Sequence, residues 1–512
     1  MGVAVSHSLT ECLGATVSRY PDRPALTIDD RTFTYAQLAG AVGALAAALA
    51  EGGVGPDQRV AILFPNSPQF VISYFAVLQT GATVVPLHCL QGPEELAHAV
   101  NDSGAETLVA LNALAPVVEA VRLRAPGLKR VIISGESKLE GVESWESLLR
   151  PRMGPAPVVP RTEDDLAVLI YTSGTTGRPK GAMLSHGNLL ANARSCKQVL
   201  EINHNDVFCG VLPLFHAFGA TICMILPVMC GAQSVLVPKF SPLTVLETVV
   251  AYKATVLAGV PSMFAVMAQV RTERNFDLSG LRACASGGAA LPNEVLYAFD
   301  ERYGTHIVEG YGPTEASPVV SVNPPRGLRK VGTVGPALPQ VSIRICDEDM
   351  NWVPAGTEGE ICVQGPNVMQ GYWHNPTATA ETIRNGWLLT GDIGMLDEDG
   401  YLSICDRKKD MIIVGGMNVY PREVEDVLFR LPAVAEAAVI GVPSRLRGED
   451  VKAFISLREG ASLEAQTVID FCKNHLANYK VPRTVEFREA LPLSGTGKVL
   501  KRLLREEHQA CR

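Results

Sequence analysis

The chain has 512 residues, of which 47% are hydrophobic and 19% charged, with 46 glycines and 34 prolines. This length predicts two to four domains around a large buried core, and the composition excludes disordered, collagen-like and coiled-coil proteins. The formal net charge is -8, so the total charge predicts no basic face for nucleic acid.

Twelve cysteines occur without any C-x-x-C pair, which argues against a metal-ligand motif and a disulfide framework. We therefore expect a cytoplasmic protein. Residues 207–237 carry no Asp, Glu, Lys or Arg, but Pro213 and Pro227 interrupt them. This pattern predicts a buried strand and helix and no transmembrane segment. Peripheral membrane contact and a homodimer remain open at this point.

Taken in chain order, the first four hundred or so residues alternate short apolar runs with helix-length amphipathic segments. That rhythm is typical of an α/β fold in which mainly parallel sheets are covered by helices. We expect the polar loops at the strand ends to hold the chemistry. Strands are predicted at 59–64, 83–87, 107–111, 166–170 and 254–258, and helices at 67–80 and 93–102.

Five consecutive charged residues, 406–410, follow a predicted strand at 401–405. We place a domain boundary there, which gives a large domain over 1–405, a hinge at 406–410 and a small mobile α+β domain over 411–512. The small domain is predicted to hold strands at 411–414, 437–442 and 451–457 and helices at 421–429 and 463–476, the last capped by Ser462.

The strongest motif is Tyr171-Thr-Ser-Gly-Thr-Thr-Gly-Arg-Pro-Lys-Gly181, directly after the predicted strand 166–170. Its glycines let backbone N–H groups approach an anion, its hydroxyls add donors, and its lysine adds a positive charge. The spacing differs from that of a Walker loop. The predicted phosphate-binding residues are Thr172, Ser173, Gly174, Thr175, Thr176, Gly177 and Lys180.

Five further segments follow this loop, at 212–219, 311–315, 389–393, 406–425 and 492–498. In this order the set resembles the acyl-adenylate-forming enzymes, which include acyl-CoA synthetases, adenylation domains of peptide synthetases and beetle luciferases. The resemblance covers nearly the whole chain. It implies that ATP activates a carboxylic acid to an acyl-AMP, with Mg²⁺, and that a thiol such as that of coenzyme A then captures the acyl group.

The segment at 311–315 suits a nucleotide. Tyr311 is able to stack on adenine, Gly312 permits a close approach, and Glu315 offers an oxygen ligand for Mg²⁺. The resemblance adds Thr172 as a second metal ligand. It also implies that Asp392 and Arg407 bind the ribose, and that Gly287 and Thr314 complete the nucleotide site.

Lys498 is the predicted catalytic cation. Attack of a carboxylate on the α-phosphorus develops negative charge, which a lysine on a glycine-flanked loop would stabilise. Glu315 is the second predicted catalytic residue, because the Mg²⁺ that it is expected to bind would act together with Lys498. By resemblance, the aromatic ring of His216 gates the path between the acyl carbon and the incoming thiol, although a lone apolar-flanked histidine is more often structural.

The two half-reactions require different geometries, because the thiol needs the side that Lys498 occupies during adenylation. The resemblance implies that the small domain swings about Lys409, and that Gly415 and Gly416 then line the path of the thiol. Such gating requires only two populated states.

The acyl pocket is predicted to be apolar and small-walled. No acidic residue follows Phe215 and His216 to pair with an amino group, and no cation stands in 259–263 for a second carboxylate. A medium- or long-chain fatty acid is the first choice and an aryl acid the second. The acceptor is coenzyme A or a carrier protein, and a nonenzymatic nucleotide-binding relative is a third hypothesis. The predicted wall consists of Val260, Met263, Ser286, Gly287, Gly288, Ala289 and Ala290. Of these, Val260, Met263, Gly288 and Ala289 are the predicted substrate-binding residues.

Overall fold

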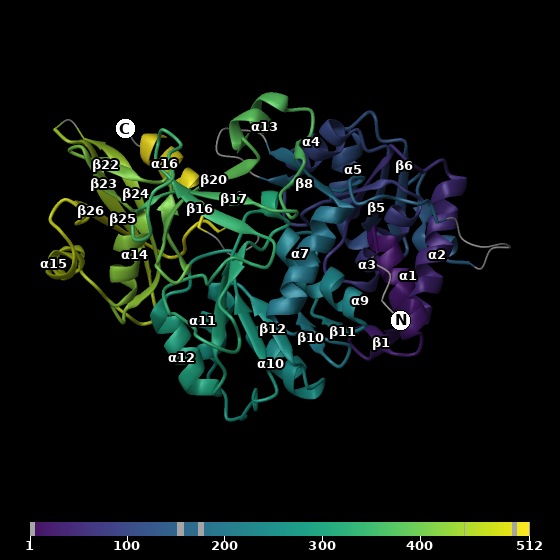
Figure 1. Ribbon diagram of the computed structural model, residues 1–512, viewed down its shortest axis with the longest axis horizontal. Coiled ribbons are helices and arrows are strands. Elements are labelled where there is room, and N and C mark those ends of the chain that lie inside the picture. Colours follow the sequence, from purple (N-terminus) through teal and green to yellow (C-terminus); the bar gives the residue numbers. More distant parts are fainter. Residues whose placement is uncertain (1–5, 151–157, 173–178, 445, 494–498, 511–512) are drawn as a thin grey trace.

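The computed structural model describes residues 6–150, 158–172, 179–444, 446–493 and 499–510. Three sheets and their covering helices form a large body, and a fourth sheet lies in a small C-terminal unit at one side of it (Figure 1). The predicted mixed α/β fold with mainly parallel sheets in the large part is confirmed.

The first eight-stranded sheet is parallel except at its two edge pairs. Its central strands are short runs of small and branched apolar residues, and β12 is buried along its whole length. This is expected for a sheet covered on both faces. The strand order is β15 (Ser321–Val322), β14 (Ile307–Tyr311), β13 (Ala283–Ser286), β12 (Val256–Gly259), β10 (Val207–Gly210), β11 (Gln233–Leu236), β1 (Pro24–Ile28) and β2 (Arg31–Thr34).

The second eight-stranded sheet is parallel from β8 to β7, and the hairpin of β8 and β9 adds an antiparallel end. This hairpin matters for function because it flanks the predicted phosphate loop. The order is β18 (Gly371–Tyr372), β9 (Lys180–Ser185), β8 (Leu166–Thr172), β4 (Thr83–Pro86), β3 (Arg59–Leu63), β5 (Thr107–Leu111), β6 (Arg130–Ser134) and β7 (Glu143–Ser144).

Helices pack on both large sheets and bury apolar faces against them. Local signals set their starts. For example, the Ser185 hydroxyl accepts the backbone N–H of Asn188 at 3.1 Å, and the Asn188 side chain accepts that of Ser185 at 2.9 Å, so the pair caps α7. The helices of this part are α1 (Leu9–Arg19), α2 (Tyr35–Glu51), α3 (Pro68–Gln79), α4 (Pro93–Ser103), α5 (Ala115–Arg122), α6 (Trp145–Leu148), α7 (His186–Val199), α8 (Ala217–Ala220), α9 (Leu226–Cys230), α10 (Pro242–Ala251), α11 (Pro261–Ala268), α12 (Asn293–Tyr303) and α13 (Pro376–Thr382).

Two five-stranded sheets complete the fold. The first is antiparallel and contains β16 (Ser342–Cys346), β17 (Gly359–Gln364), β20 (Trp387–Leu396), β19 (Ile383–Arg384) and β21 (Leu402–Arg407). The second belongs to the small unit and contains β23 (Met417–Val419), β22 (Ile412–Val414), β25 (Gly448–Leu457), β24 (Val434–Ser444) and β26 (Thr484–Arg488). Its helices are α14 (Pro421–Phe429), α15 (Ala465–His475) and α16 (Lys501–Ala510).

All the predicted strands and helices are present, with bounds that differ by a few residues at most. The cap assigned to Ser462 is wrong. α15 begins at Ala465, and Glu464 occupies the N-cap position in an extended conformation without a side-chain hydrogen bond. Here the packing of the helix against the sheet sets its start, through Val468 and Cys472, which are both fully buried.

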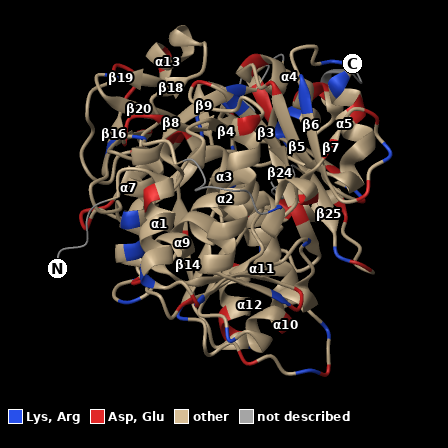
Figure 2. Cartoon of the chain, turned by 90° about the vertical axis from the view of Figure 1, so that its right-hand side faces the viewer, with Lys and Arg blue, Asp and Glu red and all other residues tan. Residues whose placement is uncertain are grey.

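The apolar segment 207–237 forms β10, α8, a π-helical stretch at Thr221–Ile225, α9 and β11, most of it buried. This confirms the predicted buried strand and helix. Among the residues that the structure describes, no helix has both the length and the apolar character required to cross a membrane. Acidic and basic residues are interspersed over the face shown in Figure 2.

Glu309 lies inside β14 and is only 6% exposed. Its carboxylate accepts the backbone N–H of Leu291 at 3.3 Å. Burial raises the pKa of Glu309 to about 7, although the nearby charges of Arg422 and Arg329 oppose the shift and that of Asp426 adds to it. Because the folded pKa exceeds the unfolded one, this group contributes stability that is full below about pH 4.5 and is lost as the pH rises through 7.

We therefore expect Glu309→Gln to raise the thermal unfolding midpoint at pH 8 by about 2 °C and to give no gain at pH 5. The amide keeps an acceptor for Leu291 but carries no charge to bury. Thermal unfolding at both pH values checks this result, with the exposed Glu301→Gln as a control. A gain of the same size at both pH values would show that charge burial is not the cause.

Candidate active site

The predicted phosphate loop connects β8 to β9. Thr172, the last residue of β8, lies opposite Lys180, the first residue of β9. The strand pairing therefore fixes the two ends of the loop side by side. Ser173, Gly174, Thr175, Thr176 and Gly177 lie outside the described residues, and their role stays a prediction.

Glu315 lies in the short 3₁₀ turn Thr314–Ala316 and faces the end of β8. Its Oε1 accepts the hydroxyl of Thr172 at 3.3 Å and that of Tyr372 at 2.9 Å. The structure thus brings together the two predicted metal ligands. Mg²⁺ is often held by one or two carboxylates together with substrate phosphates, and an oxygen pair beside a phosphate loop fits such an ion.

Tyr372 was not predicted from the sequence. It belongs to β18, at the edge of the second sheet, and the Nζ of Lys180 lies 5.2 Å from the centroid of its ring. Burial raises the pKa of Tyr372 well above its usual value, and the Glu315 carboxylate adds to the shift. The hydroxyl therefore stays protonated and donates to Glu315.

The predicted adenine and ribose residues also meet. Tyr311, at the end of β14, donates its hydroxyl to Oδ2 of Asp392 on β20 at 2.5 Å. The Nε of Arg407 on β21 lies 3.4 Å from Oδ1 of the same carboxylate, because Asp392 and Arg407 are paired across the two strands. Burial and the Asp392 charge raise the pKa of Tyr311 well above its usual value, so this hydroxyl is a donor.

Gly312 has a structural reason to be glycine that the sequence did not reveal. A Cβ at this position would lie 1.7 Å from the carbonyl oxygen of Pro318. The backbone turns back on itself here, between Tyr311 and the turn that begins at Thr314. The missing side chain is therefore required by the loop that presents Glu315, whether or not adenine also lies against it.

The predicted acyl wall gathers at the carboxyl ends of β12 and β13, which are adjacent parallel strands. Val260 follows β12 directly and is the N-cap of α11, and Met263 lies in the first turn of that helix. A Cβ on Gly288 would lie 3.6 Å from Val260, and one on Gly287 would lie 3.2 Å from the ring of Phe218. The structure thus brings this part of the wall together, whereas Ala289 is exposed.

His216 precedes α8 and acts as its N-cap. Its Nδ1 accepts the backbone N–H of Phe218 at 3.3 Å. The neighbouring Phe215 ring lies 4.3 Å from that of His88, measured between centroids. The cap fixes the imidazole against the backbone N–H of Phe218, and the gating role of His216 stays a prediction.

The predicted hinge contains the end of a strand and a turn. Asp406 and Arg407 pair with β20 and so belong to its sheet, and Lys409 lies in the turn that follows. The Asp410 carboxylate accepts a guanidinium N–H of Arg505 on α16 at 2.7 Å, which ties the small unit to this turn. Lys498 lies outside the described residues.

Gly415 and Gly416 form the two-residue turn between β22 and β23, with φ values of +59° and +81°. Two consecutive positive φ angles are the requirement of a type I′ hairpin turn, which explains the glycine pair. A Cβ at either position would meet nothing within 4 Å among the described residues. The predicted contact with the thiol path therefore stays open.

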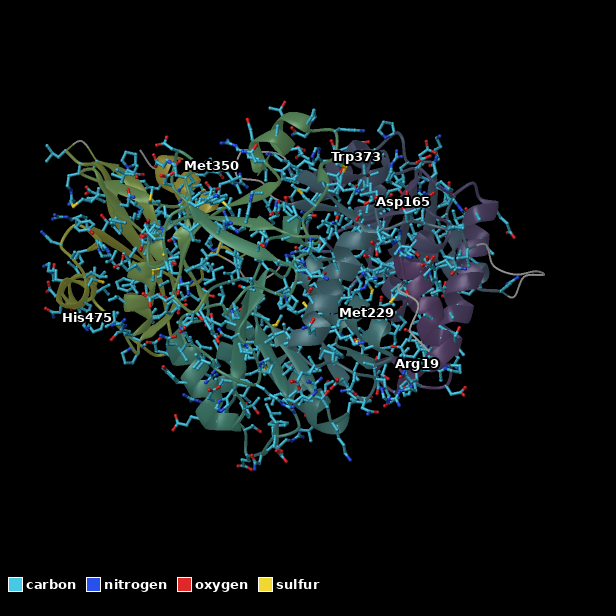
Figure 3. All side chains as sticks on the ribbon, in the orientation of Figure 1. Arg19, Asp165, Met229, Met350, Trp373 and His475 are labelled. Carbon is cyan, nitrogen blue, oxygen red and sulfur yellow. The ribbon has the colours of Figure 1, made fainter. Side chains whose placement is uncertain are left out.

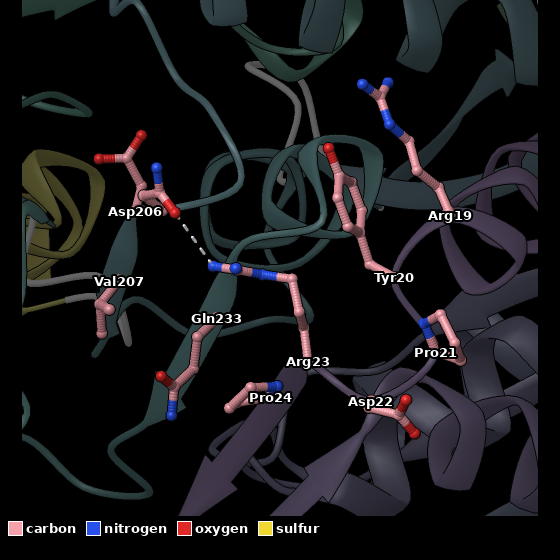
Figure 4. Close-up of a pocket in the computed structure, with 10 residues that line it drawn as sticks. Arg19, Tyr20, Pro21, Asp22, Arg23, Pro24, Asp206, Val207 and Gln233 are labelled. Carbon is pink, nitrogen blue, oxygen red and sulfur yellow. Dashed lines mark hydrogen bonds between the residues drawn. The ribbon is translucent and has the colours of Figure 1, made fainter.

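A cavity of about 470 Å³ lies elsewhere among the described residues, where the end of α1 meets β10 and β11. Figure 4 shows its lining, in which Arg23 points toward the loop at Asp206. The Nη2 of Arg23 lies 3.4 Å from Oδ1 of Asn205. None of the predicted site residues lines this cavity, so it does not belong to the candidate active site.

The described site thus combines the Thr172 hydroxyl, the Glu315 and Asp392 carboxylates and the Tyr311 ring, a set that suits a magnesium nucleotide. The chain belongs to the AMP-binding enzyme family, whose sequence model matches residues 13–373. The model of the AMP-binding enzyme C-terminal domain matches residues 423–498. These matches confirm the resemblance to the acyl-adenylate-forming enzymes. They also support the use of ATP, which is common to these enzymes.

Three similar proteins illustrate the range of this family. A long-chain-fatty-acid–CoA ligase of Bacillus subtilis is 37% identical over 98% of this chain and 94% of its own length. A feruloyl-CoA synthase of an Amycolatopsis species is 39% identical over 94% of this chain and 95% of its own length. The crystal structure of an anthranilate CoA ligase with anthranoyl-AMP covers 100% of this chain and 99% of its own, with a TM-score of 0.92 at 30% identity.

Glu315→Gln is expected to raise the Mg²⁺ concentration required for half-maximal ATP–pyrophosphate exchange by about tenfold. The amide oxygen still accepts the two hydroxyls, so the change removes one negative charge and little else. A titration of Mg²⁺ against exchange rate checks this, with Glu301→Gln as the control. An unchanged Mg²⁺ requirement would remove Glu315 from the metal site.

Proposed function

We propose that the protein is an AMP-forming fatty acid–CoA ligase. An oxygen of the fatty-acid carboxylate attacks the α-phosphorus of ATP, and pyrophosphate leaves. The sulfur of coenzyme A then attacks the carbonyl carbon of the acyl-AMP, the thiol proton is lost, and AMP leaves. The observation that carries the proposal is the nearly full-length similarity to long-chain-fatty-acid–CoA ligases.

The geometry supports a role for each group. Thr172 and Glu315 would hold Mg²⁺, which supplies positive charge to the phosphate oxygens. Asp392 would accept the ribose hydroxyls, and Arg407, whose Nε lies 3.4 Å from Oδ1 of that carboxylate, would orient it. Tyr311 would hold Asp392 in place through its hydroxyl while its ring lies against adenine.

The acid is proposed from the wall at the ends of β12 and β13. Val260 and Gly288 lie against each other there, and no charged side chain stands between Gly259 and Met263. An apolar wall with small members favours an alkyl chain. An aryl acid is the second candidate, because the feruloyl-CoA synthase is as similar to this chain as the fatty-acid ligases are.

An acid panel distinguishes these functions. The purified full-length chain is incubated with ATP, Mg²⁺, coenzyme A and either palmitate, octanoate or ferulate, and acyl-CoA and AMP are measured. Palmitate or octanoate turned over faster than ferulate would support the proposal, and the reverse order would establish the aryl acid. A pantetheinylated carrier protein in place of coenzyme A tests the acceptor. No AMP from any acid would contradict an adenylating enzyme.

A further inference from the structure

One oxygen of the Glu315 carboxylate accepts two hydroxyl donors. Thr172 and Tyr372 both donate to Oε1, at 3.3 Å and 2.9 Å. Among the described residues, no hydrogen bond reaches Oε2. The two donors thus distinguish the two oxygens of the carboxylate, since both of them reach Oε1.

Tyr372 is held firmly enough to act in this way. It is paired with Ala182 of β9, and its backbone N–H donates to the Thr379 hydroxyl at 2.8 Å. The next residue, Trp373, labelled in Figure 3, donates its indole N–H to the carbonyl oxygen of Asp102 on α4 at 3.1 Å. Contacts on both sides of Tyr372 therefore fix the position from which its hydroxyl reaches Glu315.

The same side chain also contacts the only basic residue described in the phosphate-loop motif. The Nζ of Lys180 lies 5.2 Å from the centroid of the Tyr372 ring, within the range of a cation–π contact. The ring and the hydroxyl therefore act on different partners. The ring faces the lysine that is predicted to bind phosphate, and the hydroxyl faces the carboxylate that is predicted to bind the metal.

We propose that Tyr372 is a positioning residue that selects the metal-facing oxygen of Glu315 through its hydroxyl and places Lys180 through its ring. The inference rests on the proposed function. Hydrogen-bonded partners of a ligating carboxylate orient it, and their loss typically weakens metal binding by about 10- to 100-fold. Tyr372 never touches the substrate in this role.

Two substitutions separate the two contacts. Tyr372→Phe removes the hydroxyl and keeps the ring, whereas Tyr372→Leu removes both. We expect Tyr372→Phe to weaken Mn²⁺ binding in the presence of α,β-methylene-ATP by about tenfold while leaving the affinity for the metal-free analogue unchanged. Tyr372→Leu is expected to weaken both. The free Mn²⁺ signal in electron paramagnetic resonance measures Mn²⁺ binding. Calorimetry in the presence of EDTA measures the affinity for the metal-free analogue.

Tyr401 provides a matched control. Its hydroxyl donates to the carbonyl oxygen of Leu328 at 2.7 Å, and the Nζ of Lys330 lies 4.6 Å from the centroid of its ring. Tyr401→Phe therefore removes a similar hydrogen bond beneath a similar lysine, away from Glu315. Its Mn²⁺ binding should match that of the unsubstituted chain.

The outcomes are distinct. Equal Mn²⁺ affinity in Tyr372→Phe and the unsubstituted chain would overturn the inference, as would an equal loss in Tyr401→Phe. Because the measurement uses metal binding, it does not depend on which acid is turned over. If the acid panel fails but Tyr372→Phe still weakens Mn²⁺ binding, the proposed function falls and the positioning role stands. If the unsubstituted chain binds no Mn²⁺ with the analogue, the metal site falls and the inference with it.

Discussion

Replacement of Lys498 by alanine is expected to slow acyl-AMP formation by about 100-fold, the usual cost of removing one group that stabilises transition-state charge. A cation that touches the carboxylate and the α-phosphate stabilises the charge that develops between them. Transfer of the acyl group from preformed acyl-AMP to coenzyme A should persist, because that step has no phosphorus centre under attack.

ATP–pyrophosphate exchange measures the first step, and release of AMP from added acyl-AMP and coenzyme A measures the second. Lys473→Ala is a suitable control, since Lys473 is a lysine of the same small unit that pairs with Asp470 at 2.7 Å on the surface of α15. Near-normal exchange in Lys498→Ala would remove this lysine from the first step.

The strands and helices could be predicted because their signals are local. Continuous apolar runs such as 166–170 and 107–111 predict strands buried on both faces, and each became a strand of the second sheet. The failed cap at Ser462 shows the opposite case. A cap is worth about 1 kcal/mol, and the burial of Val468 and Cys472 against the small sheet outweighs it.

The candidate site could be predicted only where residues stand in a recognisable segment. Thr172, Glu315 and Asp392 belong to such segments, and the structure brings each to a partner that was also predicted. Thr172 and Glu315 meet each other, and Asp392 meets Tyr311. Tyr372 belongs to none of them. It is 57 residues from Glu315, and the contact exists because β18 pairs with β9, which no local pattern reveals.

Gly312 and the pair Gly415–Gly416 illustrate a different limit. In the sequence, Gly312 was interpreted as permitting a close approach of adenine, and the resemblance placed Gly415 and Gly416 along the path of the thiol. The structure gives a backbone reason as well, a close approach to Pro318 in one case and a type I′ turn in the other. Substitution of these glycines would therefore disturb the fold locally and could not test their role in binding.

The predicted hinge is better tested by a backbone restraint. We expect Lys409→Pro to separate the two half-reactions. Proline fixes φ near −65° and removes the N–H, and it disfavours a helical conformation at the preceding Lys408. In the structure Lys408 donates its N–H to the carbonyl oxygen of Gly391 at 2.9 Å, and Asp410 donates its own to that of Arg407 at 2.9 Å. A proline between them restricts the turn through which the small unit would swing.

We expect one half-reaction of Lys409→Pro to fall by about 100-fold, the scale of a small misplacement of reacting groups, while the other stays within a few-fold. Exchange of pyrophosphate and capture of added acyl-AMP by coenzyme A measure the two steps separately. Lys409→Ala removes the same side chain but leaves the backbone free, so it should retain both activities. A restraint at the pivot must favour one domain orientation over the other, and so must slow one half-reaction more than the other. If Lys409→Pro loses both activities equally while its thermal unfolding is unchanged, Lys409 is not the pivot.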